Sequence, residues 1–356
     1  MADFPSDTRF SSDTRFLSDT RFTPDELTEA LGRYDIGKIR KVMRLVGGSK
    51  RAPKIVVTTN RGRFLLKRRI QGKDDVYRVA FAHAVQAHLA RHFFPIAPLL
   101  TTRDKVSTML QLGSSIYEMF KFIGGLRYGG SAEETIDVGR QLAKFHQHLA
   151  NFKFEWEPMK ASFHDSSTVR GHLKTVASDI AQSTERGKHS CGEELMAVYN
   201  SASVRVNELG FDSWPQQVVH GDWHPGNMLF DEGKLVAVLD FDTVKIAPPV
   251  TDLANAMLQF SLVGFQPNPA DWPDYLDQAK LVQVLNGYRE VIELDKHKLD
   301  SLLDLMIETM IAEAVLPIAA TGFFGNLKGA EFLQMILRKC RWIDKNRQTL
   351  SAAIES

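Results

Sequence analysis

The stretch Val218-Val-His-Gly-Asp-Trp-His-Pro-Gly-Asn-Met-Leu-Phe230 carries most of the information about the fold of this chain. Apolar residues typical of a buried strand lead into it, and apolar residues lead out of it. Between them lies a polar loop that contains His220, Asp222, His224 and Asn227. Proteins often display reactive side chains on loops that a rigid scaffold holds between strands. The stretch therefore predicts a strand, a functional loop and a second strand.

A second polar cluster follows this loop. The apolar segment 235–239 reads as a strand, and Asp240-Phe-Asp242 comes directly after it. Asp222, Asn227 and Asp240 together offer two carboxylates and an amide, and Mg²⁺ prefers oxygen ligands of this kind. Phosphoryl transfer needs such metal ligands, and it also needs a carboxylate that orients or deprotonates the acceptor hydroxyl. The two clusters therefore indicate phosphoryl transfer.

The first third of the chain predicts a small antiparallel sheet. Extended segments at 39–46, 54–59, 64–70, 107–112 and 115–122 are separated by turn residues and by one predicted helix, 74–92. Lys67 follows an apolar run in the third of these segments, so we expect it to be partly buried. Phosphoryl transfer requires a cation on the nucleotide phosphates, and Lys67 is the candidate for it.

From Ser131 onward the apolar residues follow a helical period. We therefore predict an α+β, two-lobed fold with a small antiparallel sheet in the first lobe, residues 23–124. A larger and mostly helical lobe, residues 125–356, would carry the catalytic loop and the substrate site. The segment Ser-Asp-Thr-Arg-Phe occurs three times within residues 1–22, which we predict to be a disordered arm. The capping box Thr23-Pro-Asp-Glu26 predicts that ordered structure begins with a helix.

Composition excludes several classes of protein. The 356 residues include 44 Lys and Arg against 43 Asp and Glu, a balance that argues against a general nucleic-acid binder. No apolar run reaches the roughly 18 residues that a membrane-spanning helix needs. The N-terminus lacks the basic and then apolar order of a secretory signal, and the two cysteines form no metal-binding or disulfide pattern. We expect a cytoplasmic protein with no nucleic-acid partner and no membrane partner.

On these residues the chain resembles the aminoglycoside phosphotransferase and choline kinase-like enzymes, a phosphotransferase enzyme family with the protein-kinase-like fold. The resemblance extends from about Tyr34 to the C-terminus, and it is most specific at 220–227, at 240–242 and at Asp252-Leu-Ala254. It implies ATP-dependent transfer of the γ-phosphate to a hydroxyl of a small molecule. The implied acceptor is an amino sugar, an amino alcohol or a homoserine-like compound, and the implied cofactors are ATP and Mg²⁺, with the nucleotide between the lobes.

The resemblance also implies roles for single residues. Asp222 would be the catalytic base, and His224 would approach the transferred group. Asn227 and Asp240 would hold Mg²⁺, and Lys67 would contact the α- and β-phosphates of ATP.

Two further roles follow from the same resemblance. Backbone groups around Phe120 and Phe122 would pair with adenine, at the end of the last strand of the first lobe. Asp252 would be the buried carboxylate that braces the catalytic loop.

The chain departs from the family at one position. The family usually places a glutamate on the helix after the lysine strand, but the predicted helix 74–92 contains none. Either Lys67 would be held by phosphate contacts and by a weaker partner such as His83 or Gln86, or the active conformation would be less constrained. The missing glutamate also leaves open a protein that binds nucleotides as a regulator and has lost catalysis.

A metal-dependent hydrolase is the alternative from another class. His220, Asp222 and His224 stand at alternate positions, and alternate side chains of a strand share one face. Three such ligands, with Asp240 as a fourth, would suit Zn²⁺. That interpretation gives no role to Pro225-Gly-Asn227 or to the two-lobed layout.

Overall fold

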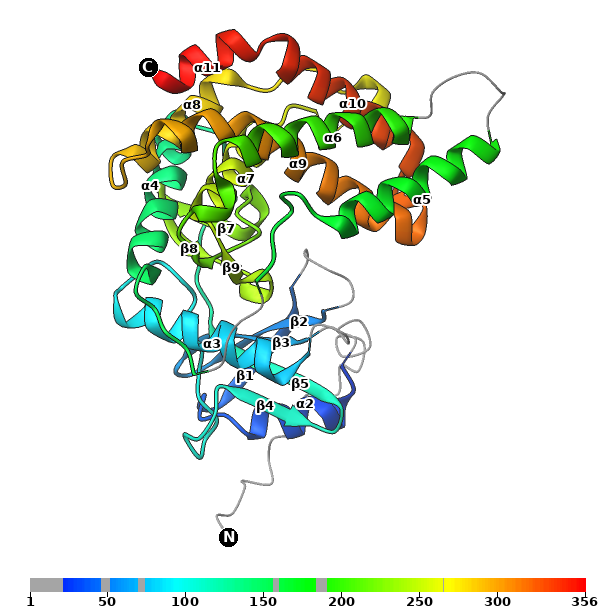
Figure 1. Cartoon of the computed structure of the whole chain (residues 1–356). Helices are drawn as coiled ribbons and strands as arrows, with labels where there is room; N and C mark the ends of the chain where they lie inside the picture. The colour runs from blue at the N-terminus through cyan, green and yellow to red at the C-terminus, as the bar shows by residue number, and fades with distance from the viewer. Residues whose placement is uncertain (1–21, 46–51, 70–73, 156–159, 184–190, 265) are drawn as a thin grey trace. The chain divides into compact units, whose positions relative to one another are not determined.

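The computed structural model describes residues 22–45, 52–69, 74–155, 160–183, 191–264 and 266–356. The chain divides into two compact units, the first formed by residues 1–124 and 237–242 and the second by residues 125–236 and 243–356 (Figure 1). The chain thus passes from the second unit to the first within a strand and returns after Asp242. Most of the arm predicted at 1–22 lies outside the described residues. The roles that we assigned to the two lobes stay a prediction.

An antiparallel sheet forms the centre of the first unit. Its strands among the described residues lie in the spatial order β1-β2-β3-β5-β4. They are β1 (Ile39–Arg44), β2 (Lys54–Thr59), β3 (Gly62–Arg68), β4 (Met109–Leu112) and β5 (Ser115–Lys121). The register of β3 and β5 places Lys67 directly opposite Glu118. Strand order, which the sequence pattern does not contain, therefore decides which side chain lies beside the lysine.

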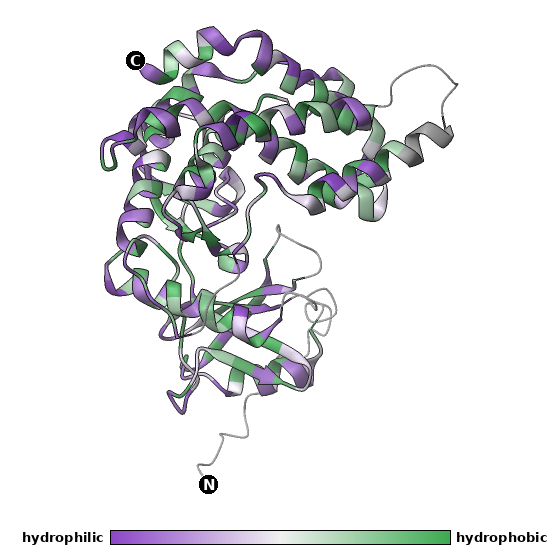
Figure 2. Cartoon of the chain, viewed as in Figure 1, coloured by the Kyte–Doolittle hydropathy of each residue, from purple (hydrophilic) through white to green (hydrophobic). Residues whose placement is uncertain are grey.

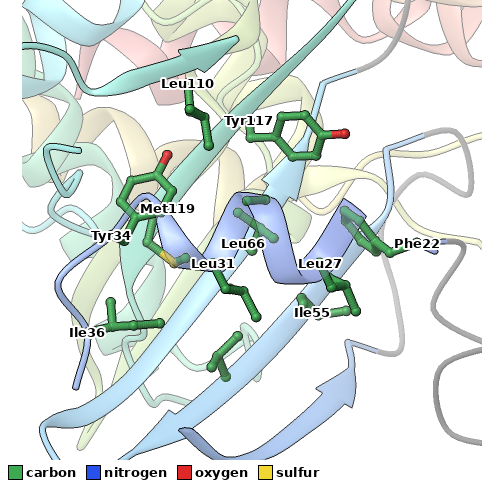
Figure 3. Packing of buried hydrophobic residues seen from close by; sticks show 12 residues of the cluster. Phe22, Leu27, Leu31, Tyr34, Ile36, Ile55, Leu66, Leu110, Tyr117 and Met119 are labelled. Carbon is green, nitrogen blue, oxygen red and sulfur yellow. The ribbon is translucent and has the colours of Figure 1, made fainter. Parts of the chain in front are cut away.

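Two helices accompany this sheet, α2 (Pro24–Gly32) and α3 (Val76–Arg91). The capping box predicted for the start of α2 is present, because Thr23 and Glu26 exchange side-chain and backbone hydrogen bonds. Figure 3 shows the apolar side of α2 packed among buried side chains of the strands. Phe22, the last residue of the third repeat, belongs to this core and is almost fully buried. The final residue of the predicted arm is thus part of the core and not disordered.

The second unit is mainly helical. Its helices are α4 (Ala132–Leu149), α5 (Ser167–Ser183), α6 (Cys191–Glu208), α7 (Pro249–Ser261), α8 (Gln278–Arg289), α9 (Lys296–Thr321), α10 (Gly329–Lys345) and α11 (Arg347–Glu355), with 3₁₀ turns at Phe211–Ser213 and Pro269–Asp271. Figure 2 shows hydrophilic and hydrophobic residues alternating along these helices, as expected for helices with one exposed face. The sheet and the helices together confirm the predicted α+β class.

Short strands hold the functional loop within this helical unit. The strand β6 (Gln217–Val219) pairs with β9 (Lys245–Ala247), and β7 (Met228–Asp231) forms a hairpin with β8 (Lys234–Val238). A further pair, β10 (Phe323–Phe324) and β11 (Leu327–Lys328), lies between α9 and α10. The sequence did not reveal β9, because three residues are too few for a recognisable alternation.

Helices α4 and α8 approach each other closely at two glycines. A Cβ atom on Gly139 or on Gly287 would lie 1.9 Å from a carbonyl oxygen of the facing helix. No residue with a side chain fits there without moving a backbone. The close contact fixes α4 against α8 and brings His146 next to Tyr288, whose hydroxyl lies 2.9 Å from Nδ1 of the histidine.

Within the described part of the chain, none of the helices combines the length and the apolar character that crossing a membrane requires.

Candidate active site

The polar loop after β6 brings three of the predicted residues together. Nδ2 of Asn227 donates to Oδ2 of Asp222 at 2.9 Å and to the carbonyl oxygen of the same residue at 3.1 Å. Nε2 of His224 lies 3.5 Å from Oδ2 of Asp222. The 3₁₀ turn η2 (Pro225–Asn227) folds the loop back on itself, so that residues five positions apart meet. The backbone amide of Gly226 donates to Nδ1 of His224 at 3.0 Å, which leaves the ring proton on Nε2, facing the aspartate.

Asp222 is both ionised and accessible. Burial acts to raise the pKa of its carboxyl, but the hydrogen bonds from His224 and Asn227 outweigh that effect, so the pKa lies below its ordinary value. About 37% of the side-chain surface is exposed. A carboxylate in this state can accept a hydrogen bond from a hydroxyl that approaches it at neutral pH.

A buried carboxylate on α7 braces the loop. Asp252 accepts hydrogen bonds from the backbone amides of His220 at 2.6 Å and of Gly221 at 2.8 Å, while Nε2 of His146 lies 3.3 Å away. Burial acts to raise the pKa of Asp252, but these donors hold it below its ordinary value. Gly221 has a φ of 75°, in the left-handed region that glycine adopts most readily. The contact expected between Asp252 and the loop is therefore present.

The first unit holds a second cluster, centred on Lys67. Its Nζ donates to both carboxylate oxygens of Asp242 at 2.9 Å and lies 3.3 Å from Oδ1 of Asp240. Burial acts to lower the pKa of this lysine, but Glu118 and the two aspartates outweigh it and raise the pKa. Lys67 is therefore a buried lysine that keeps its charge, as a phosphate-binding cation must.

Glu118 on β5 places a buried carboxylate beside Lys67. Its side chain is 1% exposed, accepts from Nη1 of Arg69 at 2.5 Å and lies 3.7 Å from Nζ of Lys67. Nε2 of His83 on α3 lies 2.7 Å from it. Burial acts to raise the pKa of Glu118, but these partners lower it to about 2. The expectation of His83 or Gln86 as partner of Lys67 was wrong: His83 bonds to Glu118, and Gln86 donates to a carbonyl of its own helix.

Asp240 and Asp242 differ in their accessibility. Asp242 is held by Lys67 and by Nη2 of Arg69 at 2.8 Å, and its side chain is mostly buried. The Asp240 side chain is 36% exposed, and its backbone φ is 60°, a conformation that residues other than glycine rarely adopt. Such strain is common at ligand-binding positions. Between the two aspartates, Asp240 is therefore the more exposed one.

The donor chemistry of the predicted metal ligands fits Mg²⁺. Asp240 supplies a carboxylate and Asn227 an amide oxygen, and both are hard oxygen ligands. Asp240 belongs to the first unit and Asn227 to the second. Their roles as metal ligands stay a prediction.

The predicted adenine contacts lie at the end of β5. Phe120 pairs with Leu65 of β3, and the backbone amide of Phe122 donates to the carbonyl of Arg63 at 3.0 Å. The Arg63 guanidinium lies 4.0 Å from the centre of the Phe122 ring. The pairing of adenine with backbone groups around Phe120 and Phe122 stays a prediction.

The geometry of the loop argues against a zinc site. His220 is fully buried, with its ring close to those of Phe145 and Trp223, whereas Asp222 and His224 lie at the surface. Across the described residues, no three His, Cys, Asp or Glu side chains are grouped so that they could hold a metal ion. The residues of the His-x-Asp-x-His pattern therefore do not share a face.

An α+β chain with a braced aspartate loop and a buried lysine on the sheet has the features of a phosphotransferase. The sequence profile of the Phosphotransferase enzyme family matches residues 42–294, most of the chain. The chain therefore belongs to this family, which confirms the resemblance that the loop indicated.

Known relatives share the fold and vary in their substrates. A homoserine kinase of Phenylobacterium zucineum is 24% identical over 228 residues, which are 62% of this chain and 64% of that protein. The match thus spans less than two thirds of the length of this curated relative. The structure of a microcompartment-associated aminopropanol kinase aligns with a TM-score of 0.66 at 14% identity, over 91% of this chain and 97% of that one.

A second solved structure gives the same result. The amicoumacin kinase hAmiN in complex with AMP-PNP, Ca²⁺ and Ami aligns with a TM-score of 0.64 at 12% identity, over 93% of this chain and 96% of that one. At such low identity these likenesses establish the fold alone. The predicted bilobal, protein-kinase-like fold is confirmed.

Two residues near these clusters, Glu118 and Lys245, were not among the candidates predicted from the sequence. Glu118 carried a readable signal, since an acid between apolar strand residues is rarely placed there without a partner. Lys245 on β9 carried none, because only the packing brings it near the loop. Glu313 on α9 is a further acid close to the loop. Burial and the charge of Asp222 raise the pKa of Glu313 to about 7, and Nε2 of Gln259 donates to it at 2.5 Å.

Proposed function

We propose that this protein transfers the γ-phosphate of ATP to a hydroxyl of a small molecule, with Asp222 as the catalytic base. The observation that carries the proposal is an ionised, accessible Asp222, oriented by Asn227 and His224 on a loop that Asp252 braces. Catalysis of phosphoryl transfer consists mainly of positioning and electrostatic stabilisation, and a braced carboxylate suits that task. The acceptor would be an amino sugar, an amino alcohol or a homoserine-like compound.

The remaining residues have roles that fit their surroundings. Lys67 would bind the α- and β-phosphates, since its charge is maintained by Glu118 and the aspartates. His224 carries its proton on Nε2 and would donate to the transferred group. Mg²⁺, held by Asn227 and Asp240, would neutralise the charge of the nucleotide phosphates. The first unit would serve the nucleotide and the second the acceptor, with adenine on the backbone around Phe120 and Phe122.

Glu118 also argues against the hypothesis of a nucleotide-binding regulator that has lost catalysis. That hypothesis rested on the missing helix glutamate, and Glu118 supplies a buried carboxylate to Lys67 from the sheet instead. With this partner in place, no observation favours a silent protein over an enzyme.

The test compares Asp222→Ala with Asp231→Ala, which replaces the exposed last residue of β7. ATP consumption is measured with Mg²⁺ and a panel of amino sugars, amino alcohols and homoserine. We expect Asp222→Ala to lose a factor on the order of 100 or more in kcat while nucleotide binding is kept, and Asp231→Ala to resemble the wild type. Near wild-type turnover of Asp222→Ala would show that this carboxylate is not the base.

Nucleotide binding is tested separately by thermal unfolding. A ligand at about 100 times its Kd adds about 2.7 kcal/mol to the stability of the folded state. We expect stabilisation by Mg·ATP that is weakened in Asp240→Ala. The absence of any stabilisation at millimolar Mg·ATP, together with zinc in the purified protein, would favour the hydrolase.

A further inference from the structure

A pocket in the second unit adjoins the catalytic loop. It encloses about 370 Å³, its open mouth included, and Gly221 of the loop forms part of its wall. Strand β9, helices α7 and α9, and the segment 162–164 provide the other walls. Pockets bind small molecules through a few polar groups in fixed positions. The polar groups of this wall that lack a partner therefore decide which ligand it can bind.

Lys245 is a cation of this wall without a counterion. Its Nζ lies 4.6 Å from the centre of the Phe163 ring, and no carboxylate of the described residues lies within ion-pair distance of it. Burial lowers its pKa, although Asp252, Glu313 and Asp222 act on it from farther away. Buried ammonium groups are normally paired, because burying a lone charge is costly. An anionic ligand group would remove that cost.

The two acids that line the pocket already have their donors. Asp252 accepts from two backbone amides of the catalytic loop and contacts a histidine. Glu308 lies 2.7 Å from Nδ1 of His164 and accepts from Oγ of Ser203 at 2.6 Å, and a backbone amide donates to it at 3.1 Å. Neither carboxylate therefore depends on a ligand cation, and the unmet charge of the wall is the positive charge of Lys245.

A second, independent observation concerns Asn255, one turn after Asp252 on α7. Its side chain is 4% exposed and lines the same pocket, and its buried Oδ1 has no hydrogen-bond partner among the described residues. Buried amide groups are almost always hydrogen-bonded, and an unsatisfied one costs about 1–3 kcal/mol. The amide oxygen and nitrogen can exchange places by a flip of the group. Asn255 thus offers a ligand both a donor and an acceptor beside Lys245.

Lys245 is also close to the reactive carboxylate. A Cβ on Gly221 would lie 3.1 Å from Cε of Lys245, so the lysine stem packs against the residue that precedes Asp222. We propose that the acceptor carries a carboxylate in addition to its hydroxyl, and that Lys245 and Asn255 bind this carboxylate while the hydroxyl reaches Asp222. Lys245 is then the residue that determines specificity. The inference rests on the proposed function, because it names the class of the acceptor.

The test uses pairs of acceptors that differ only in the carboxylate: L-serine with ethanolamine, and L-homoserine with 3-aminopropanol. Rates of ATP-dependent phosphorylation are measured for the wild type, Lys245→Met, Lys245→Arg and the exposed control Lys234→Met. We expect the wild type to favour at least one carboxylated member at least tenfold in kcat/KM. Lys245→Met should reduce this preference below threefold by raising KM for that member alone. Lys245→Arg should restore it, and Lys234→Met should leave it unchanged.

Several results would overturn the inference. One is a preference for the decarboxylated members, and another is a preference that survives in Lys245→Met. An equal loss of kcat on both members of a pair would instead place Lys245 at the transferred phosphoryl group. Thermal unfolding of each variant verifies its folding.

Failure of the inference and failure of the proposed function give different results. If Mg·ATP stabilises the protein but neither serine nor homoserine adds more than its decarboxylated partner, the carboxylate site is wrong and the kinase proposal stands. If Mg·ATP itself neither binds nor is consumed, the proposed function fails and this inference fails with it.

Discussion

Replacing Glu118 by glutamine tests how the lysine cluster of the first unit is held. The carboxylate is 1% exposed and contacts Arg69, His83 and Lys67 at 2.5, 2.7 and 3.7 Å. Glutamine keeps the shape but removes the charge, and its NH₂ group must then face at least one of the cations. Breaking a buried ion pair by removing one partner costs about 3–5 kcal/mol. We expect Glu118→Gln to lower the free energy of unfolding by about that amount.

The pKa of Glu118 gives a second value for the stability that its charge contributes. Its carboxyl has a pKa of about 2 in the folded protein against 4.5 ordinarily. Such a difference corresponds to about 3 kcal/mol of stability, present above pH 4.5 and lost as the pH falls toward 2. The unfolded chain binds the proton first, so acid favours unfolding. We therefore expect the stability of the wild type to fall over this range more steeply than that of Glu118→Gln.

Urea unfolding at pH 7 and at several lower pH values measures both effects. Glu331→Gln is the control, since Glu331 forms an exposed ion pair with Lys328 and should contribute less than about 1 kcal/mol. Glu118→Asp keeps the charge but shortens the side chain, so comparison with Glu118→Gln separates the effect of losing the charge from the effect of altered packing. A Glu118→Gln protein as stable as the Glu331→Gln control, with the pH profile of the wild type, would refute the reasoning.

Three further predictions concern the second unit. Gly139→Ala should destabilise the protein by several kcal/mol in urea unfolding, because the new Cβ would lie 1.9 Å from a backbone oxygen of α8. Gly171→Ala on α5 is the control. Since a Cβ there meets nothing within 4 Å, this variant should be neutral or slightly stabilising. Asp252→Asn should lower kcat at least tenfold and leave the KM for ATP nearly unchanged in steady-state assays, because an NH₂ group would face the loop amides. Equal effects on kcat and on KM would contradict the bracing role of Asp252. The pKa of Glu313 is raised from 4.5 to about 7 in the folded protein. Between pH 4.5 and pH 7 the folded protein therefore binds more protons than the unfolded chain. Its stability falls as the pH rises through this range. Glu313→Gln should therefore be more stable than the wild type at pH 8, by up to about 3 kcal/mol, and should lose that advantage at pH 4.5. An equal difference in stability at both pH values would show that the ionisation of Glu313 is not the cause.

The elements of the fold were readable because each depends on neighbours in the sequence. The capping box at Thr23 marks the start of α2 through bonds between residues three positions apart. The alternation around 54–59 and 64–70 predicts strands because side chains of a strand point to opposite faces in turn. The loop from His220 to Asn227 likewise contains the residues that orient Asp222, and they meet through a single 3₁₀ turn. Local pattern alone thus determined the kind of most elements, though not the short strand β9, and the course of the loop 220–227.

The partners of the charged groups were decided by packing between distant segments. Glu118 meets Lys67 because β5 lies beside β3, and Lys245 reaches the pocket because β9 pairs with β6. Asp252 braces a loop that lies about thirty residues earlier in the chain. The free energy that holds such ions in place depends on burial and on distances to opposite charges, and both are set only when the segments pack. The sequence therefore determined which residues are candidates for the site, and the tertiary structure decided which charges those residues face.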